Sequence, residues 1–224
     1  MTRGGPAWVG AGYLVGSIPA AYVAARATGS SVVLERASSR SSEGDAHLLL
    51  AGHASPAVTA AAMAGDVVKG MLVAAAARRA GLTPGWRAAT AVAVVAGHAF
   101  PPFARDFAGR GLAAAAGVTL VNLPGPMVVA GSVLVAGKAL GHTGVGSTVG
   151  FASVPVVAAV AGRPRSMIWM GAGVLGVILA RRLVGVGRVA RRDGWVRSLT
   201  RRLLFDSDDI DPGMSSGGRG HSRV

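Results

Sequence analysis

The chain has 224 residues, of which 51% are apolar and 15% charged, and its mean hydropathy is +0.48. Soluble domains average about 25% charged residues, so this composition argues against an ordinary soluble protein. The net charge is +13 and there is no cysteine, which excludes disulfides and thiolate metal sites. Because the basic residues stand at the ends of apolar runs and in a C-terminal cluster, we attribute the charge to anchoring on anionic lipid headgroups rather than to nucleic acid.

The first apolar run, residues 8–25, is predicted to be a membrane span that the protein retains, because the chain stays apolar after it. Pro19 interrupts this run. In a helix bundle, neighbouring helices and Ser17 can satisfy the carbonyl group that a proline leaves without a donor. We therefore expect one span in which Ser17 compensates for Pro19.

Residues 26–46 form a polar, serine-rich stretch that contains Ser38, Ser39 and Arg40. Two interpretations stay open. The stretch is either a flexible loop, or an anion-binding loop in which serine hydroxyls, backbone N–H groups and Arg40 contact a phosphate. It contains no GxxxxGK[ST] phosphate-loop pattern, so the residues alone do not decide between the two.

Asp66 and Lys69 stand inside the apolar run of residues 48–77. They are three residues apart, so on a helix they share one face. An isolated charge in hydrocarbon is costly, whereas two opposite charges can pair. The spacing therefore predicts either a structural ion pair that fixes a helix or two side chains that face a polar cavity.

His98 lies near the end of the next apolar run, residues 88–104, and Gly109, Arg110 and Gly111 follow shortly after it. A histidine on an apolar helix is usually held by a hydrogen bond to a neighbour, but a position at a helix end close to basic residues favours a function. Glycines permit close approach of the backbone, and an arginine fork binds phosphoryl oxygens. These four residues are therefore candidates for a phosphate site.

Further apolar runs complete the predicted bundle. Residues 112–137 carry no charge but are broken at residues 122–126, so two segments are expected there; residues 145–162 and 167–180 follow. The runs predict an all-α integral membrane protein, a polytopic helical bundle of about five to seven transmembrane helices with short or re-entrant segments.

The C-terminal part is the most basic. Eight arginines lie between residues 181 and 202, interleaved with apolar residues, which is typical of a basic amphipathic helix on the cytoplasmic leaflet. The chain then becomes acidic and finally rich in Gly and Ser, a composition typical of disorder. We therefore divide the chain into a polytopic membrane domain (1–184), a basic amphipathic cytoplasmic segment (185–204) and a disordered tail (205–224).

Four short motifs occur in the order and spacing of a known family: GSIP at residues 16–19, DVVKG at 66–70, GHAFP at 97–101 and AGRGLA at 108–113. Over about residues 10–160 the chain resembles the bacterial acyl-phosphate:glycerol-3-phosphate acyltransferases of the PlsY type. The resemblance implies a multi-pass enzyme of the bacterial plasma membrane, and the arginine excess after residue 181 predicts a cytoplasmic C-terminus. Its partners would be acyl phosphate, glycerol 3-phosphate and membrane lipids, and it would need no cofactor.

The implied reaction moves an acyl chain from acyl phosphate to the 1-hydroxyl of glycerol 3-phosphate and yields lysophosphatidic acid and phosphate. Acyl phosphate is already activated, so the enzyme has to bring two anions together and neutralise them. The resemblance assigns three roles: catalytic (His98, Lys69, Ser38), binding of substrate phosphate (Ser39, Arg40, Gly109, Arg110, Gly111) and shaping of the site (Asp66, Ser17, Ser147). No metal is expected.

The chain departs from the family pattern at several positions. The family's loop after the first helix, GSGNxGATN, corresponds to residues 37–45, where this chain reads ASSRSSEGD. Arg110 replaces the usual lysine, while Ala108 replaces a glycine and Ala114 a threonine. The C-terminal HxxNIxRLL signature is not recognisable around residues 181–192.

Two alternatives to an active enzyme therefore stay open. The first is a catalytically inactive relative that binds lipid or a partner protein, which the altered loop at residues 37–45 favours. The second is a small transporter, in which Asp66 and Lys69 would form a coupling site. We rank the acyltransferase first, because intramembrane charges have no evident use in an inert scaffold.

Overall fold

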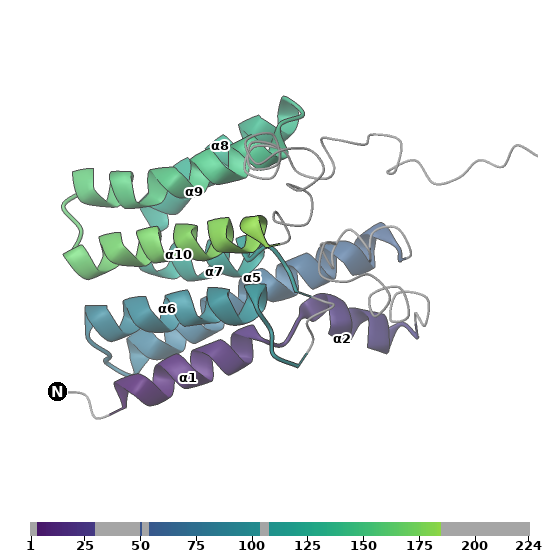
Figure 1. Ribbon diagram of the computed structural model, residues 1–224, viewed down its shortest axis with the longest axis horizontal. Coiled ribbons are helices and arrows are strands. Elements are labelled where there is room, and N and C mark those ends of the chain that lie inside the picture. Colours follow the sequence, from purple (N-terminus) through teal and green to yellow (C-terminus); the bar gives the residue numbers. More distant parts are fainter. Residues whose placement is uncertain (1–3, 30–49, 51–53, 104–107, 185–224) are drawn as a thin grey trace, which may run out of the picture.

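The computed structural model describes residues 4–29, 50, 54–103 and 108–184. Within these ranges every element of regular secondary structure is a helix, as predicted (Figure 1). The helices are α1 (Gly5–Gly16), α2 (Ala20–Ala27), α5 (Pro56–Arg79), α6 (Pro84–Ala99), α7 (Leu112–Asn122), α8 (Pro124–Ala139), α9 (Thr143–Val160) and α10 (Arg165–Leu183).

The helix boundaries follow local sequence signals. Helices α5, α6 and α8 each begin at a proline, whose fixed φ suits the first helical position and whose missing N–H would have no partner there anyway. Ser55 additionally caps α5, because its hydroxyl accepts a hydrogen bond from the Val58 backbone N–H at 3.3 Å. These signals explain where three of the helices begin.

Two of the predicted apolar runs each contain two helices in the structure. The uncharged run of residues 112–137 becomes α7 and α8, which confirms the two expected segments. The first run, expected to be a single span interrupted by Pro19, contains two helices, α1 and α2, bent by 43° at a break that includes Pro19. Pro19 has an extended backbone and forms the N-cap of α2, and the two helices together are long and apolar enough to form one broken span or a re-entrant segment.

Several helices are long and apolar enough to cross a membrane. In the described part of the chain, α5, α9 and α10 meet this condition, and the bent α1–α2 pair raises the number from three to at most four. Helices α6 and α8 have 16 residues each, about 24 Å at 1.5 Å per residue. The expected five to seven spans therefore require shorter helices to cross as well, by tilt or local thinning of the bilayer.

The helices pack in pairs through small residues. Gly16 of α1 lies against the Val94 backbone of α6, and Gly117 of α7 lies against the Val67 carbonyl of α5. In each case a side chain would collide with the neighbouring main chain. Close backbone approach of this kind is the usual way for helices to associate in lipid, where there is no hydrophobic drive between them.

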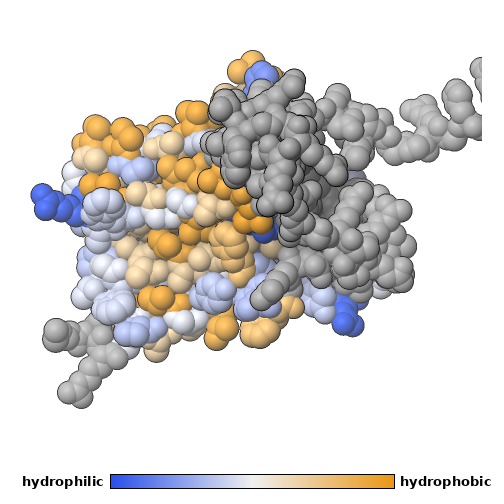
Figure 2. Space-filling model, in the orientation of Figure 1, coloured by the Kyte–Doolittle hydropathy of each residue, from blue (hydrophilic) through white to orange (hydrophobic). Residues whose placement is uncertain are grey.

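The core lies between α6, α7 and α10, and the outer surface is apolar. Buried core side chains include Val94, Val118 and Ile178, each 0% exposed. Facing outward, Val160 is 86% and Trp169 73% exposed. Figure 2 shows apolar side chains over the helix face turned to the viewer, with the most hydrophilic groups at its edges. A bundle that is apolar inside and outside suits a lipid environment.

The bundle has two chemically different ends. At the loop end, α6 finishes, residues 100–103 and 108–111 lie, α7 begins and α10 finishes. At the proline end, three helices begin at or just after a proline, namely Pro84, Pro124 and Pro164. Helix α6 joins the two ends, so they lie about 24 Å apart along its axis.

Candidate active site

Asp66, Lys69 and His98 form a buried cluster at the loop end. The Lys69 ammonium lies 2.7 Å from Asp66 Oδ1 and 3.3 Å from His98 Nδ1, and His98 Nδ1 lies 3.4 Å from the same Asp66 oxygen. Asp66 is fully buried and His98 is 4% exposed. The prediction that Asp66 and Lys69 share a helix face is confirmed, and His98 of α6 joins them from a different helix.

The Asp66–Lys69 pair fills the break between α1 and α2. Lys69 Nζ donates to the carbonyl oxygens of Gly16 and Ile18 at 3.0 and 2.8 Å. Asp66 Oδ1 accepts from the Ala20 backbone N–H at 3.4 Å. The cation thus meets the negative end of α1 and the anion meets the positive end of α2. Each charge satisfies main-chain groups that the break exposes, which would otherwise be costly in lipid.

The Lys69 ammonium has three N–H groups and three oxygen acceptors within 3.0 Å, namely two carbonyls and one carboxylate. Ser17 contributes nearby, because its hydroxyl donates to the Tyr13 carbonyl at 2.8 Å. Compensation by Ser17 was predicted, but the larger share of the carbonyl groups around Pro19 is satisfied by Lys69 from another helix.

The loop before α7 packs directly on His98. The Gly109 N–H donates to the His98 carbonyl at 3.3 Å, and a Cβ on Gly109 would collide with His98 Nε2. Gly111 has a φ of +85° and forms the N-cap of α7, a conformation that side chains disfavour. Both glycines of the Gly109–Arg110–Gly111 sequence are therefore required by geometry, and they hold Arg110 between the histidine and the start of α7.

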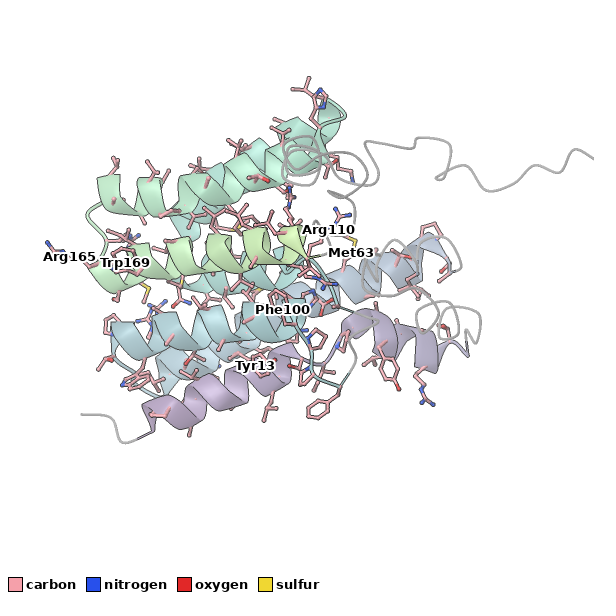
Figure 3. All side chains as sticks on the ribbon, in the orientation of Figure 1. Tyr13, Met63, Phe100, Arg110, Arg165 and Trp169 are labelled. Atoms are coloured by element: carbon pink, nitrogen blue, oxygen red, sulfur yellow. The ribbon has the colours of Figure 1, made fainter. Side chains whose placement is uncertain are left out.

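The same loop is fastened to α1 and α10. The Tyr13 hydroxyl donates to the Phe100 carbonyl at 2.8 Å. Arg181 Nη2 donates to the Ala108 carbonyl at 3.4 Å, and the Arg181 guanidinium lies 6.0 Å from the centre of the Phe100 ring. Figure 3 shows Tyr13, Phe100 and Arg110 at this end of the bundle, far from Arg165 and Trp169.

Arg182 is a buried cation of the loop end. It is 7% exposed, and its guanidinium donates to Ser147 Oγ at 2.6 Å, Thr148 Oγ1 at 2.8 Å and the Gly144 carbonyl at 3.1 Å. These contacts tie the last turn of α10 to the first turns of α9. Ser147, predicted to shape the site, is fully buried and bonded to this arginine.

The structure therefore brings most of the predicted residues to one end of the molecule. Asp66, Lys69 and His98 are in mutual contact, Gly109 touches His98, and the remaining glycine, Arg110, Ser17 and Ser147 lie at the same end. Ser38, Ser39 and Arg40 lie outside the described residues, as do the predicted segments 185–204 and 205–224. In the described part of the chain, no three metal-binding side chains come together.

Sequence reasoning missed Arg181 and Arg182 as residues of this site, because it grouped them with the arginines of the C-terminal cluster. A signal was present in the spacing. The buried residues of α10 include Met170, Val174 and Ile178, and Arg182 continues this series at the next interval of four. A charge on the buried face of an apolar helix is a stronger sign of function than one on its outer face.

The family comparison agrees with the geometry. The model of the glycerol-3-phosphate acyltransferase family matches residues 7–191, most of the chain. The chain belongs to the glycerol-3-phosphate acyltransferase family. Membership confirms the resemblance that the four sequence motifs indicated, and it extends the match through α10, beyond the region in which those motifs lie.

Individual members of the glycerol-3-phosphate acyltransferase family match over shorter segments. The glycerol-3-phosphate acyltransferase of Pseudomonas entomophila is 38% identical over 109 residues, 48% of this chain and 55% of that protein. The one from Klebsiella pneumoniae is 33% identical over 150 residues, 66% of this chain and 71% of that protein. The chain spans about half the length of several curated relatives that it matches.

The fold matches that of a solved family member over most of both chains. The crystal structure of PlsY (YgiH), an integral membrane glycerol 3-phosphate acyltransferase, in its glycerol 3-phosphate form superposes with a TM-score of 0.71 at 22% identity, covering 91% of this chain and 96% of that chain. Its lysophosphatidic acid form gives a TM-score of 0.68 at 22% identity, with 87% and 98% covered. The prediction of an all-α integral membrane bundle is confirmed.

Proposed function

We propose that the protein transfers an acyl chain from acyl phosphate to glycerol 3-phosphate and so produces lysophosphatidic acid and phosphate. The observation that carries the proposal is the contact between the buried Asp66–Lys69–His98 cluster and the Gly109–Arg110–Gly111 loop. Family membership supports the same reaction.

The loop is well suited to bind a phosphate. Arg110 is partly buried between two glycines, and α7 begins immediately after Gly111. The first N–H groups of a helix have no partner within it and carry partial positive charge, which attracts anions. Arg110 adds a full positive charge with a planar fork that matches two phosphoryl oxygens.

The reaction needs positioning and charge neutralisation more than a protein nucleophile. The hydroxyl oxygen of glycerol 3-phosphate attacks the acyl carbonyl carbon and forms an ester bond. The bond from that carbon to the phosphate oxygen breaks, and phosphate leaves with the bonding electrons. The hydroxyl proton passes to the departing phosphate, so atoms and charges balance. Fixed cations near both phosphates lower the repulsion between the two anionic substrates.

The contacts of each residue indicate its role in the proposed reaction. Arg110 is the group we assign to substrate phosphate. His98 lies against the loop and sets the position of Gly109. Lys69, predicted to be catalytic, has its N–H groups directed to Asp66 and two carbonyls, so we assign it to positioning, together with Asp66. Ser38, Ser39 and Arg40 keep the roles that the resemblance implies for them.

The orientation in the membrane follows from the C-terminus. Helix α10 ends at the loop end, and the arginine-rich residues after it are expected at the cytoplasmic leaflet. The active site would then face the cytoplasm of a bacterial plasma membrane, with access to a water-soluble acceptor and to a lipid-soluble acyl donor.

The test is phosphate release from palmitoyl phosphate by the full-length protein in an uncharged detergent, with and without glycerol 3-phosphate. We expect acceptor-dependent release that falls by about 10²–10³-fold in Arg110→Ala. The matched control is Arg165→Ala, an exposed arginine at the opposite end, which should keep wild-type activity. Equal rates in both variants would contradict the assignment of Arg110.

The same assay distinguishes the inactive relative from the enzyme. Binding of palmitoyl phosphate without acceptor-dependent release by wild type would show that the altered loop at residues 37–45 has abolished catalysis. The transporter alternative is disfavoured by geometry, because Asp66 is fully buried and Lys69 is bonded to main-chain carbonyls that a coupling cycle would have to release.

A further inference from the structure

The proline end contains a pocket of about 360 Å³, separate from the site at the loop end. This volume is within the range of small-molecule sites, about 300–1,000 Å³. Three arginines line it, Arg78 at the end of α5, Arg87 in the first turn of α6 and Arg163 before α10. None of these residues takes part in the acyl transfer described above.

The helix termini around the pocket add positive potential. Its lining includes Pro84 and Pro124, the first residues of α6 and α8, and Pro164, the N-cap of α10. Three helix N-termini therefore meet at the pocket, and each contributes about half a positive charge. The C-termini of α5 and α7 lie at the same end, but Arg78 stands in the last turn of α5 and complements its dipole.

The arginines of this pocket have no protein anion to pair with in the described part of the chain. Among residues 4–29, 50, 54–103 and 108–184, Asp66 is the single acidic side chain, and it is bonded to Lys69 in the loop-end cluster. Arg87 Nη2 donates to Asn122 Oδ1 at 3.0 Å, a neutral partner. Arg87 Nε is buried and has no hydrogen-bond partner.

A buried donor without a protein partner, three like charges around one cavity and three helix N-termini together favour the binding of an anion. We propose that this pocket binds a phosphate group, either that of an anionic lipid headgroup or free inorganic phosphate, on the membrane face opposite the active site. The end that holds Arg165 and Trp169 in Figure 3 is the end where the bound lipid's headgroup would lie. Guanidinium groups bind phosphate oxygens in pairs, which suits a pocket with three of them.

The test compares two double variants with the same loss of charge. Arg78→Ala/Arg163→Ala removes two pocket arginines, whereas Arg79→Ala/Arg165→Ala removes two exposed arginines at neighbouring positions that do not line the pocket. Each protein, purified in an uncharged detergent, is titrated with dioleoyl phosphatidylglycerol and, in a separate arm, with inorganic phosphate. Bound lipid is counted by native mass spectrometry, and phosphate binding is measured by calorimetry in the Arg110→Ala background, which removes the main phosphate ligand of the active site.

We expect the pocket variant to bind at least one of the two probes about tenfold more weakly than wild type, and the control variant to bind as wild type does. If the pocket variant binds only phosphatidylglycerol more weakly, the pocket is a lipid site. If it binds inorganic phosphate more weakly, with or without a loss of phosphatidylglycerol binding, the pocket is a site for the phosphate group itself. Equal binding of both probes by the two double variants would overturn the proposal, because the arginines would then act only as a diffuse positive surface.

Discussion

Both ends of the described bundle carry cations, but the surroundings of these cations differ. At the loop end, Lys69 is bonded to Asp66 and two carbonyls, and Arg182 is bonded to two hydroxyls and a carbonyl. At the proline end, Arg78 and Arg163 are exposed, and no carboxylate of the described residues lies with them. Fixed, satisfied cations form a preorganised site, whereas cations without a protein anion depend on what binds to them.

Substitutions at the two ends should therefore differ in their effect on stability. Removing a buried partner leaves the other charge without compensation, so changes at the loop end should lower stability. Removing an exposed cation relieves repulsion among like charges and costs little.

Asp66→Ala should have the largest effect on stability. It leaves the Lys69 ammonium, whose side chain is only 11% exposed, beside two carbonyls without its carboxylate, a loss of up to about 3–5 kcal/mol. Thermal unfolding in detergent measures the change. The double variant Asp66→Ala/Lys69→Met should be more stable than Asp66→Ala alone, because the uncompensated charge is gone. A double variant that is as unstable as the sum of the two single variants would show that the residues are not coupled.

Arg182→Ala should come next. The variant removes three charge-assisted hydrogen bonds between α10 and α9, but Ser147 and Thr148 keep their own bonds to the Gly144 carbonyl. The expected loss is about 1.5–3 kcal/mol, measured by thermal unfolding. Arg165→Ala, at the exposed start of α10, serves as the control and should unfold as wild type does; equal unfolding of both variants would show that the buried bonds contribute nothing.

Gly109→Ala should affect activity more than stability. A methyl group there collides with the His98 ring, so the loop that carries Arg110 must move. Overpacking costs about 1–3 kcal/mol, and a displacement of about 1 Å can lower the rate of a reaction by about 10²-fold. Phosphate release from palmitoyl phosphate measures the rate. Gly176→Ala is the matched control, since a Cβ there lies within 4 Å of no atom of another helix. Wild-type activity in Gly109→Ala would show that the contact between Gly109 and His98 is not needed for the reaction.

Arg78→Ala/Arg163→Ala should have the smallest effect on the isolated protein. Both side chains are exposed, so without added anion the unfolding free energy should change by less than about 0.5 kcal/mol. Acyl transfer should stay at the wild-type rate, because the active site is at the other end. A loss of activity in this variant would show that the two ends are coupled and would contradict the conclusion that they act independently.

Some of this site was readable from the residues and some was not. The i,i+3 spacing of Asp66 and Lys69 predicted their pairing, since helix geometry places them on one face whatever surrounds them. The glycines at 109 and 111 predicted a close backbone approach, which the contact with His98 explains. The role of Lys69 at the α1–α2 break was not readable, because Gly16 and Ile18 lie about fifty residues earlier and only packing brings them near.

The pocket at the proline end could not be predicted from the sequence either. Arg78, Arg87 and Arg163 are scattered over 86 positions and looked like ordinary anchors at the ends of apolar runs. They become a site only when three helix starts converge on one cavity.

The sequence by itself determined the helical membrane class, the family and several residues of the loop end, among them Asp66, Lys69 and His98, because hydropathy, i,i+3 pairing and short motifs are local properties of the chain. Tertiary structure alone decided which partner each charge meets. It placed Lys69 in the gap between two helices, buried Arg182 against Ser147, and gathered three arginines around a pocket where three helix N-termini meet. Such pairings depend on distances across the bundle, and those are set by how the helices pack rather than by the order of residues along any one of them.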